Sequence, residues 1–167
     1  MEDRIRYKAV APDVYNAMMG IERYLEHCGL ETALLDLICL RASMVNGCAY
    51  CIDMHWKDLR ASGEREEKLY MLAAWRESSV YSSRERAALE WTDAVTRLTD
   101  GDVADDVYRL ASQHFSDVEL AKLTLAVTAI NSWNRLNIAF HTPSGAYKSS
   151  RSPHPTQAPR SAVDAGR

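Results

Sequence analysis

The 167-residue chain lacks the features that mark several large classes of protein. It has no apolar run long enough to cross a bilayer, and its first residues lack the basic and then apolar order of a signal peptide. A net charge of −3 gives no reason to expect nucleic acid or an anionic membrane as a partner. We therefore expect a cytoplasmic protein that binds neither nucleic acid nor membrane.

Strand-like alternation of polar and apolar residues is also missing, as are internal repeats. Apolar residues recur instead at spacings of three and four, which is typical of helices. The pattern predicts an all-α single domain over residues 1–143. Pro, Ser, Ala, Arg and Gly dominate residues 144–167, so we expect a disordered tail there. Helices are expected over about 12–28, 32–45, 48–61, 64–75, 83–98, 103–113 and 116–140.

The predicted helix 32–45 is apolar almost all the way round, which indicates burial on most sides. Asp36 and Arg41 stand out in it, because an unpaired buried charge is costly. One interpretation places the Asp36 carboxylate in a reactive site. The other makes it a structural ion pair or a carboxylate that reaches solvent at an oligomer edge, and the periodicity does not separate the two.

The chemistry of the chain is concentrated in a C-x2-C-x3-H motif formed by Cys48, Cys51 and His55. Asn46-Gly47 just before it is a helix-stop signal, so a new helix should begin near Cys48. At about 100° per residue the three side chains share one face, and Cys51 and His55 form an i,i+4 pair. A cysteine in the first turn is stabilised as a thiolate by the helix dipole. The motif therefore indicates a dithiol that attacks a substrate and closes to a disulfide.

Two structural explanations of the motif are also possible: a zinc site, or an unreactive pair of buried thiols. Four cysteines in a chain of this size do not make a disulfide scaffold, and in a reducing cytosol a C-x-x-C is more often catalytic or metal-binding than structural. The motif supplies three zinc ligands where a structural site usually has four. Cys28 or Cys39 would have to be the fourth, and neither belongs to a second ligand pair. We therefore expect no bound metal.

The motif and its surroundings resemble the AhpD-like alkylhydroperoxidase branch of the carboxymuconolactone decarboxylase family, over about residues 30–143. Decarboxylase members lack the cysteine pair, which argues against decarboxylation here. The resemblance implies an AhpD-like helical bundle of six to seven helices that assembles into trimers or hexamers. It is carried by Leu40-Arg-Ala-Ser, Asn46-Gly-Cys-Ala-Tyr-Cys-Ile-Asp-Met-His55, Leu69-Tyr-Met-Leu-Ala-Ala-Trp75, Glu85-Arg-Ala-Ala-Leu89 and Asn131-Ser-Trp-Asn-Arg-Leu-Asn-Ile-Ala-Phe140.

The resemblance also implies the catalytic residues. Cys51 takes the role of the attacking thiolate, Cys48 resolves the sulfenic acid, and His55 relays a proton. The family has a glutamate base twelve residues before the first cysteine, and that position is Asp36 here. Tyr50 stands between the cysteines, where the best-studied type has a histidine.

The expected function is thiol-dependent reduction of alkyl hydroperoxides in antioxidant defence, without metal, flavin or haem. The resemblance implies a lipoyl group or a thioredoxin-like protein as the dithiol electron donor. A redox sensor or general thiol–disulfide reductase could use the same cysteines with slow peroxide turnover. A helical assembly module without catalysis is a third interpretation, and the cysteine pair argues against it.

Overall fold

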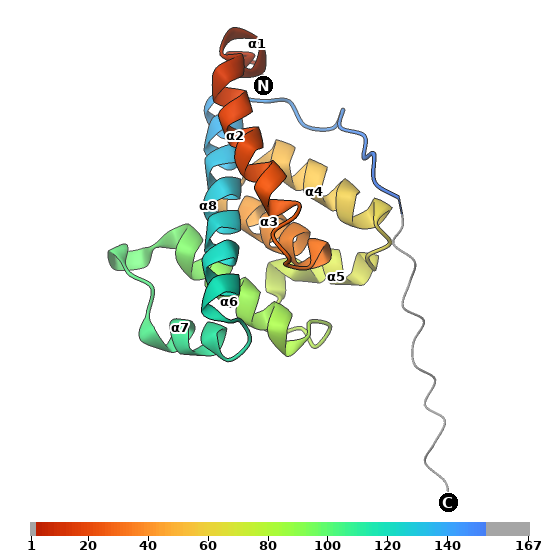
Figure 1. The fold of residues 1–167 in the computed structure, drawn as a ribbon. Helices are drawn as coiled ribbons and strands as arrows, with labels where there is room; N and C mark the ends of the chain where they lie inside the picture. The colour runs from red at the N-terminus through yellow and green to blue at the C-terminus, as the bar shows by residue number, and fades with distance from the viewer. Residues whose placement is uncertain (1–2, 153–167) are drawn as a thin grey trace, which may run out of the picture.

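The computed structural model describes residues 3–152, and all regular secondary structure in that range is helical (Figure 1). This confirms the predicted all-α class. No helix within the described range has both the length and the apolar character needed to cross a membrane. The helices are α1 (Tyr7–Val10), α2 (Pro12–Leu25), α3 (Thr32–Asn46), α4 (Ala49–Ala61), α5 (Glu66–Tyr70), α6 (Ser83–Arg97), α7 (Asp105–Ser112) and α8 (Asp117–Ala139), with 3-10 turns at Met71–Ala74 and Thr99–Gly101.

Helix α3 lies at the centre, where α4, α6 and α8 all pack against it. Its leucines enter two parts of the core. Leu34 and Ile38 join the cluster shared with α6 and α8, whereas Leu37 and Leu40 join the cluster shared with α4 and α5. All four are at most 4% exposed. Burial on opposite sides explains why the helix is apolar all round, as the sequence predicted.

The turn between α3 and α4 places the cysteine motif. Gly47 ends α3 in the left-handed conformation, with φ of 69°, which glycine adopts without steric cost. The next N–H, of Cys48, bonds to the carbonyl of Ser43 at 3.0 Å, which closes the end of α3. Cys48 is then the N-cap of α4. The predicted helix stop at Asn46-Gly47 is confirmed.

Helices α6 and α8 both begin with a capping box, in which a serine and a glutamate side chain bond to each other's backbone N–H groups. Ser82 and Glu85 form the box of α6, so the cap is one residue before the predicted Ser83. Ser116 and Glu119 form that of α8, as predicted. Helix α8 runs through the whole molecule, and α2 packs alongside it (Figure 1).

Residues 144–152 lie without regular secondary structure and bind to α4 and α3 (Figure 1). The Tyr147 hydroxyl bonds to both carboxylate oxygens of Asp58, at 2.9 and 3.1 Å. Lys57 Nζ bonds to the carbonyls of Gly145 and Tyr147, at 3.1 and 3.0 Å. Composition alone predicts a disordered tail from residue 144, and it carries no sign of these long-range hydrogen bonds, which hold residues 144–152 against α4. The rest of that tail, 153–167, lies outside the described residues.

Candidate functional site

The two cysteines of the motif meet at the first turn of α4. They are joined as a disulfide with Cα atoms 5.4 Å apart, within the usual range for such bonds. Cys48 Sγ also accepts a hydrogen bond from the N–H of Cys51 at 3.4 Å. Both residues are 1% exposed. The helical spacing therefore brings the predicted pair together in its oxidised form.

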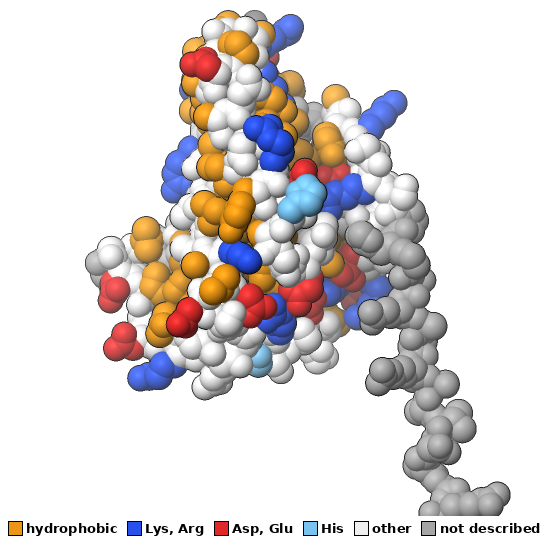
Figure 2. Space-filling model, in the orientation of Figure 1, with side chains coloured by type: hydrophobic (Ala, Val, Ile, Leu, Met, Phe, Trp, Pro, Cys, Tyr) orange, Lys and Arg blue, Asp and Glu red, His pale blue; other side chains and the backbone are white. Residues whose placement is uncertain are grey.

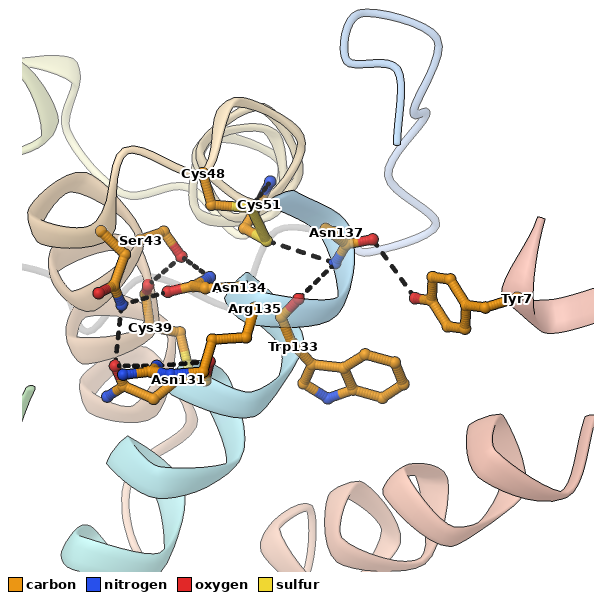
Figure 3. Close-up of a disulfide and its surroundings, with 11 residues drawn as sticks. Tyr7, Cys39, Ser43, Cys48, Cys51, Asn131, Trp133, Asn134, Arg135 and Asn137 are labelled. Atoms are coloured by element: carbon orange, nitrogen blue, oxygen red, sulfur yellow. Dashed lines mark hydrogen bonds between the residues drawn. A yellow bond between two sulfur atoms is a disulfide. The ribbon is translucent and has the colours of Figure 1, made fainter. Parts of the chain in front are cut away.

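Asn137 of α8 contacts the sulfur of Cys51 (Figure 3). Its Nδ2 donates to Cys51 Sγ at 3.5 Å and to the carbonyl of Trp133 at 2.9 Å. The hydroxyl of Tyr7 donates to Asn137 Oδ1 at 3.3 Å. A backbone carbonyl can only accept, so Nδ2 must face Trp133, and this fixes which way the amide is turned. The second Nδ2 hydrogen is thereby directed to Cys51.

His55 lies one turn after Cys51 in α4, and both residues line the same cavity. The side chain is buried, and among residues 3–152 neither ring nitrogen has a hydrogen-bond partner. Burial lowers the pKa of His55 to about 4, although the nearby Asp58 carboxylate acts to raise it. The imidazole is therefore neutral near pH 7, with one ring nitrogen that carries no proton.

The cavity that Cys51 and His55 line has a volume of about 530 Å³. Large aromatic and sulfur-containing side chains form most of its wall, which suits an organic substrate. Tyr147 and Ser150 of the segment 144–152 close one side. The aromatic and methionine residues of the wall are Tyr7, Tyr15, Met19, Tyr50, Met54, Trp133 and Tyr147.

Glu22 of α2 adds a carboxyl group to this wall. It accepts a hydrogen bond from the Trp133 indole nitrogen at 2.7 Å. Burial raises the pKa of Glu22, and the bond from Trp133 offsets part of that effect. The cavity wall thus includes a carboxyl group as well as the Cys51 side chain.

Asp36, the carboxylate that the resemblance implied as a base, is buried on α3. Its carboxylate pairs with Arg151, and the described residues that line the cavity do not include it. No hydrogen bond joins it to His55, whose nitrogens lack partners within residues 3–152. The described structure therefore brings Cys48, Cys51 and His55 together and leaves Asp36 on the neighbouring helix, bound to the segment 144–152.

The two cysteines that could supply a fourth zinc ligand lie in different parts of the structure. Cys28 and Cys39 are free cysteines. Cys39 lines the cavity, whereas Cys28 lies in the cluster between α3, α6 and α8. Within the described part of the chain, no three His, Cys, Asp or Glu side chains are placed to hold a metal ion.

Comparison with known proteins gives the family. The sequence profile described as the carboxymuconolactone decarboxylase family matches residues 12–94. The uncharacterized protein YdfG of Bacillus subtilis (strain 168) is 39% identical over 139 residues, which cover 83% of this chain and 95% of that protein. The chain belongs to the carboxymuconolactone decarboxylase family. Within it, this chain has the C-x2-C pair of the AhpD-like branch.

Three further proteins extend the comparison. A crystal structure of a protein of unknown function from Agrobacterium tumefaciens, proposed to be an antioxidant defence protein AhpD, has 42% identity and a TM-score of 0.84. It matches 87% of this chain and 100% of that one. Alkyl hydroperoxide reductase AhpD of Caulobacter vibrioides is 39% identical over 59 residues, 35% of this chain and 31% of that protein. The debrominase Bmp8 shares the fold alone, at 18% identity over 81% of this chain and 73% of that one, with a TM-score of 0.70.

Sequence reasoning on this family member missed Asn137, Glu22 and Tyr147. A signal for the first was present, because Asn131, Asn134 and Asn137 recur at intervals of three in a largely apolar helix. All three are buried. Such spacing predicts amides that face a neighbouring helix and need partners there. No comparable signal marked Tyr147 in its low-complexity segment.

Arg41, the second charge noted in α3, is structural. Its guanidinium binds Asp93 of α6 through two hydrogen bonds, of 2.6 and 2.8 Å. Arg76 and Arg97 also bind Asp93, at 2.9 and 3.3 Å. Arg41 and Asp93 therefore form a buried ion pair that joins α3 to α6.

Proposed function

We propose that the protein is an alkylhydroperoxidase-like oxidoreductase, which reduces organic hydroperoxides through Cys48 and Cys51. One observation carries this proposal: Cys51, which forms a disulfide with Cys48 at a helix N-terminus, lines a cavity of about 530 Å³ together with a neutral buried histidine. The names of the relatives from Agrobacterium tumefaciens and Caulobacter vibrioides support it. Antioxidant defence is the corresponding role in the cell.

The first half of the reaction oxidises the dithiol form. His55 accepts the proton of Cys51, and the Asn137 amide stabilises the thiolate that results. The thiolate attacks the terminal oxygen of the hydroperoxide, so an S–O bond forms and the O–O bond breaks. The alkoxide leaves with a proton as an alcohol. Cys51 is then a sulfenic acid.

The second step forms the disulfide and water. Cys48 Sγ attacks the Cys51 sulfur, and the hydroxyl group leaves with the Cys48 proton. An external dithiol then returns two electrons and two protons by exchange. We propose a lipoyl group or thioredoxin-like protein as the donor, and Asp36 as the carboxylate that assists His55 through water. The reaction needs no metal or organic cofactor.

Assembly is part of the proposal. Several large apolar side chains are exposed along α1, α2 and α8, and Figure 2 shows hydrophobic side chains on the column that α2 and α8 form. Apolar surface of this kind marks interaction sites. We propose a homo-oligomer, a trimer or hexamer, that covers it. The exposed side chains include Val10, Val14, Tyr24, Val118 and Ile138.

The test is a multiple-turnover peroxidase assay with hydrogen peroxide, tert-butyl hydroperoxide and cumene hydroperoxide. Dihydrolipoamide and thioredoxin serve as alternative donors. We expect turnover that Cys51→Ser abolishes. Cys48→Ser should leave one oxidation per chain that is not followed by a disulfide. Cys28→Ser is the matched control, because that free thiol lies in the core, outside the cavity lining.

One result would replace the proposal. If the Cys48–Cys51 disulfide forms once with peroxide but turnover stays slow with both donors, the redox-sensor interpretation is the better one. Unchanged stability and unchanged partners in the double Cys→Ser protein, without any peroxide reaction, would favour an assembly module.

A further inference from the structure

A second cavity, of about 480 Å³, lies on the other side of the cysteine pair. Cys48 and Ala49 of the α3–α4 turn line one wall, and Ile138 and His141 at the end of α8 line another. Neither Cys51 nor His55 is among its lining residues. Cys48 in turn is not among the lining residues of the first cavity. Each cysteine of the disulfide therefore belongs to a different cavity.

Two side chains separate the cavities. Tyr50 and Asn137 line both of them. Asn137 also holds the sulfur of Cys51 through its fixed amide. A molecule in the second cavity is therefore next to Cys48, with the wall between it and the hydroperoxide cavity.

The hydrogen bonds on the two sulfurs suit an ordered exchange. In thiol–disulfide exchange the attacked sulfur forms the new bond, and the other sulfur leaves as a thiolate. If Cys48 is attacked, Cys51 leaves, and the Asn137 amide stabilises its charge. When Cys48 is released later, the N–H of Cys51 stabilises it at the helix N-terminus. Each sulfur that leaves as a thiolate thus has a hydrogen-bond donor beside it.

We propose that the reducing dithiol enters the second cavity and attacks Cys48, while the hydroperoxide uses the first cavity and reacts at Cys51. This deepens the proposed function and rests on it. Both cysteines are 1% exposed, so a cysteine fixed on the surface of a folded protein cannot reach them without rearrangement. The donor that fits is a small dithiol, free or carried on a flexible arm.

The step balances as a two-electron exchange. The first donor thiol gives its proton to His141 and attacks Cys48 Sγ, so a donor–Cys48 bond forms and the Cys48–Cys51 bond breaks. The electron pair passes to Cys51, which later takes a proton. The second donor thiol then attacks the first donor sulfur and passes its proton to Cys48, which is released as a thiol while the donor becomes a disulfide. His141 has a positive φ of 54°, where the chain turns after α8 along the cavity wall.

The test uses two serines of the segment after α8 as a matched pair. Ser144 lines the second cavity and Ser150 lines the first, and both are exposed, so neither substitution removes a core contact. Ser144→Trp and Ser150→Trp place an indole in one cavity each. Ala49→Trp is a second variant for the Cys48 side. The two half reactions are then measured separately, by quenched alkylation of free thiols.

For the reductive half, the oxidised protein is prepared with diamide and mixed with dihydrolipoamide or dithiothreitol. Ser144→Trp and Ala49→Trp should slow this reduction on the order of tenfold or more, because a displaced thiol loses its alignment for attack. Their oxidation by cumene hydroperoxide should be unchanged. Ser150→Trp should slow oxidation and leave reduction unchanged. His141→Gln should slow reduction.

The proposal is overturned if neither Ser144→Trp nor Ala49→Trp slows reduction, or if Ser150→Trp slows it as much as they do. Faster reduction by thioredoxin than by dihydrolipoamide would also overturn it. Because diamide makes the disulfide, the reductive half is measured whether or not any hydroperoxide is a substrate. A failure of the peroxidase proposal is therefore seen separately, in the oxidative half.

Discussion

Arg151 and Asp36 form an ion pair that ties the segment 144–152 to α3, across 115 residues of sequence. Tyr147 of the same segment binds Asp58, which follows His55 in α4. Asp58 and Arg151 act on the pKa of His55 in opposite directions. The segment that composition marked as a tail is therefore part of the electrostatic surroundings of the proposed site.

This pairing gives Asp36 two separable roles, as a base or as an anchor. If it assists His55, Asp36→Asn should slow peroxide reduction by on the order of 10²–10⁴-fold, as is typical of a lost general base. It should also raise the pH at which Cys51 is alkylated. Arg151→Ala should retain activity, because the carboxylate remains. Equal losses in both variants would show that Asp36 acts by holding the segment.

Asn137 should tune the thiol of Cys51. A hydrogen bond of about 1 kcal/mol to the thiolate corresponds to just under one pH unit, so Asn137→Ala should raise the pKa of Cys51 by about that much. Tyr7→Phe should have a smaller effect, because the Trp133 carbonyl still orients the amide. The measurement is the rate of Cys51 alkylation against pH in the dithiol form.

Asn134→Ala is the control for that experiment. Asn134 is also buried in α8, but it bonds to Ser43 and Asn46, with no hydrogen bond to either cysteine among the described residues. Its replacement should lower stability without moving the alkylation profile. If Asn137→Ala and Asn134→Ala shift the alkylation profile of Cys51 equally, the shift comes from disturbed packing of α8 and not from the hydrogen bond to Cys51.

His55 should make stability fall in acid. Its pKa is about 4 in the folded protein, against 6.5 for an ordinary histidine, so between these values the unfolded chain binds more protons. The free energy of unfolding should therefore decrease as the pH falls from about 6.5 to 4, by about 3 kcal/mol from this group. His55→Gln should remove that part of the slope. Denaturant unfolding of both proteins across this pH range measures it, and parallel curves would contradict the assignment.

Asp93 should be important for stability and not for chemistry. Asp93→Asn leaves the buried Arg41 without its ionised partner, so we expect a loss of about 3–5 kcal/mol in the free energy of unfolding. Glu90→Gln breaks the more exposed Arg76–Glu90 pair and should cost less than about 1 kcal/mol. Urea unfolding gives both values. Equal losses of unfolding free energy in the two variants would mean that burial does not determine how much each ion pair contributes to stability.

The proposed assembly predicts a mass above that of one chain in light scattering at micromolar concentration. Val14→Glu places a charge on the exposed apolar side of α2, where the side chain is now 42% exposed. It should weaken the assembly without unfolding the protein. Lys148→Glu, at an exposed position outside these helices, is the control. A monomer mass for the parent protein would refute the homo-oligomer.

Much of the fold was predictable because its signals are local. Gly47 permits a left-handed turn, Ser116 and Glu119 cap a helix, and the spacing of Cys48 and Cys51 is set by one helical turn. Each of these depends on residues within a few positions of one another. The sequence by itself therefore determined the main helices, the cysteine pair and the buried character of α3. It did not predict α1, whose pattern is too brief to stand out, and it predicted one helix over 64–75 where the structure has the short α5 followed by a 3-10 turn.

Only the tertiary structure decided what surrounds the cysteines. Asn137 lies 86 residues from Cys51 and Tyr7 lies 130 from Asn137, so no local pattern could pair them. Arg151, which pairs with Asp36, comes from a segment with no periodicity. The lowered pKa of His55 comes mainly from removal of water, which depends on how the whole chain packs. Helix formation follows from neighbouring residues, whereas desolvation and long-range hydrogen bonds exist only once distant segments have been brought together.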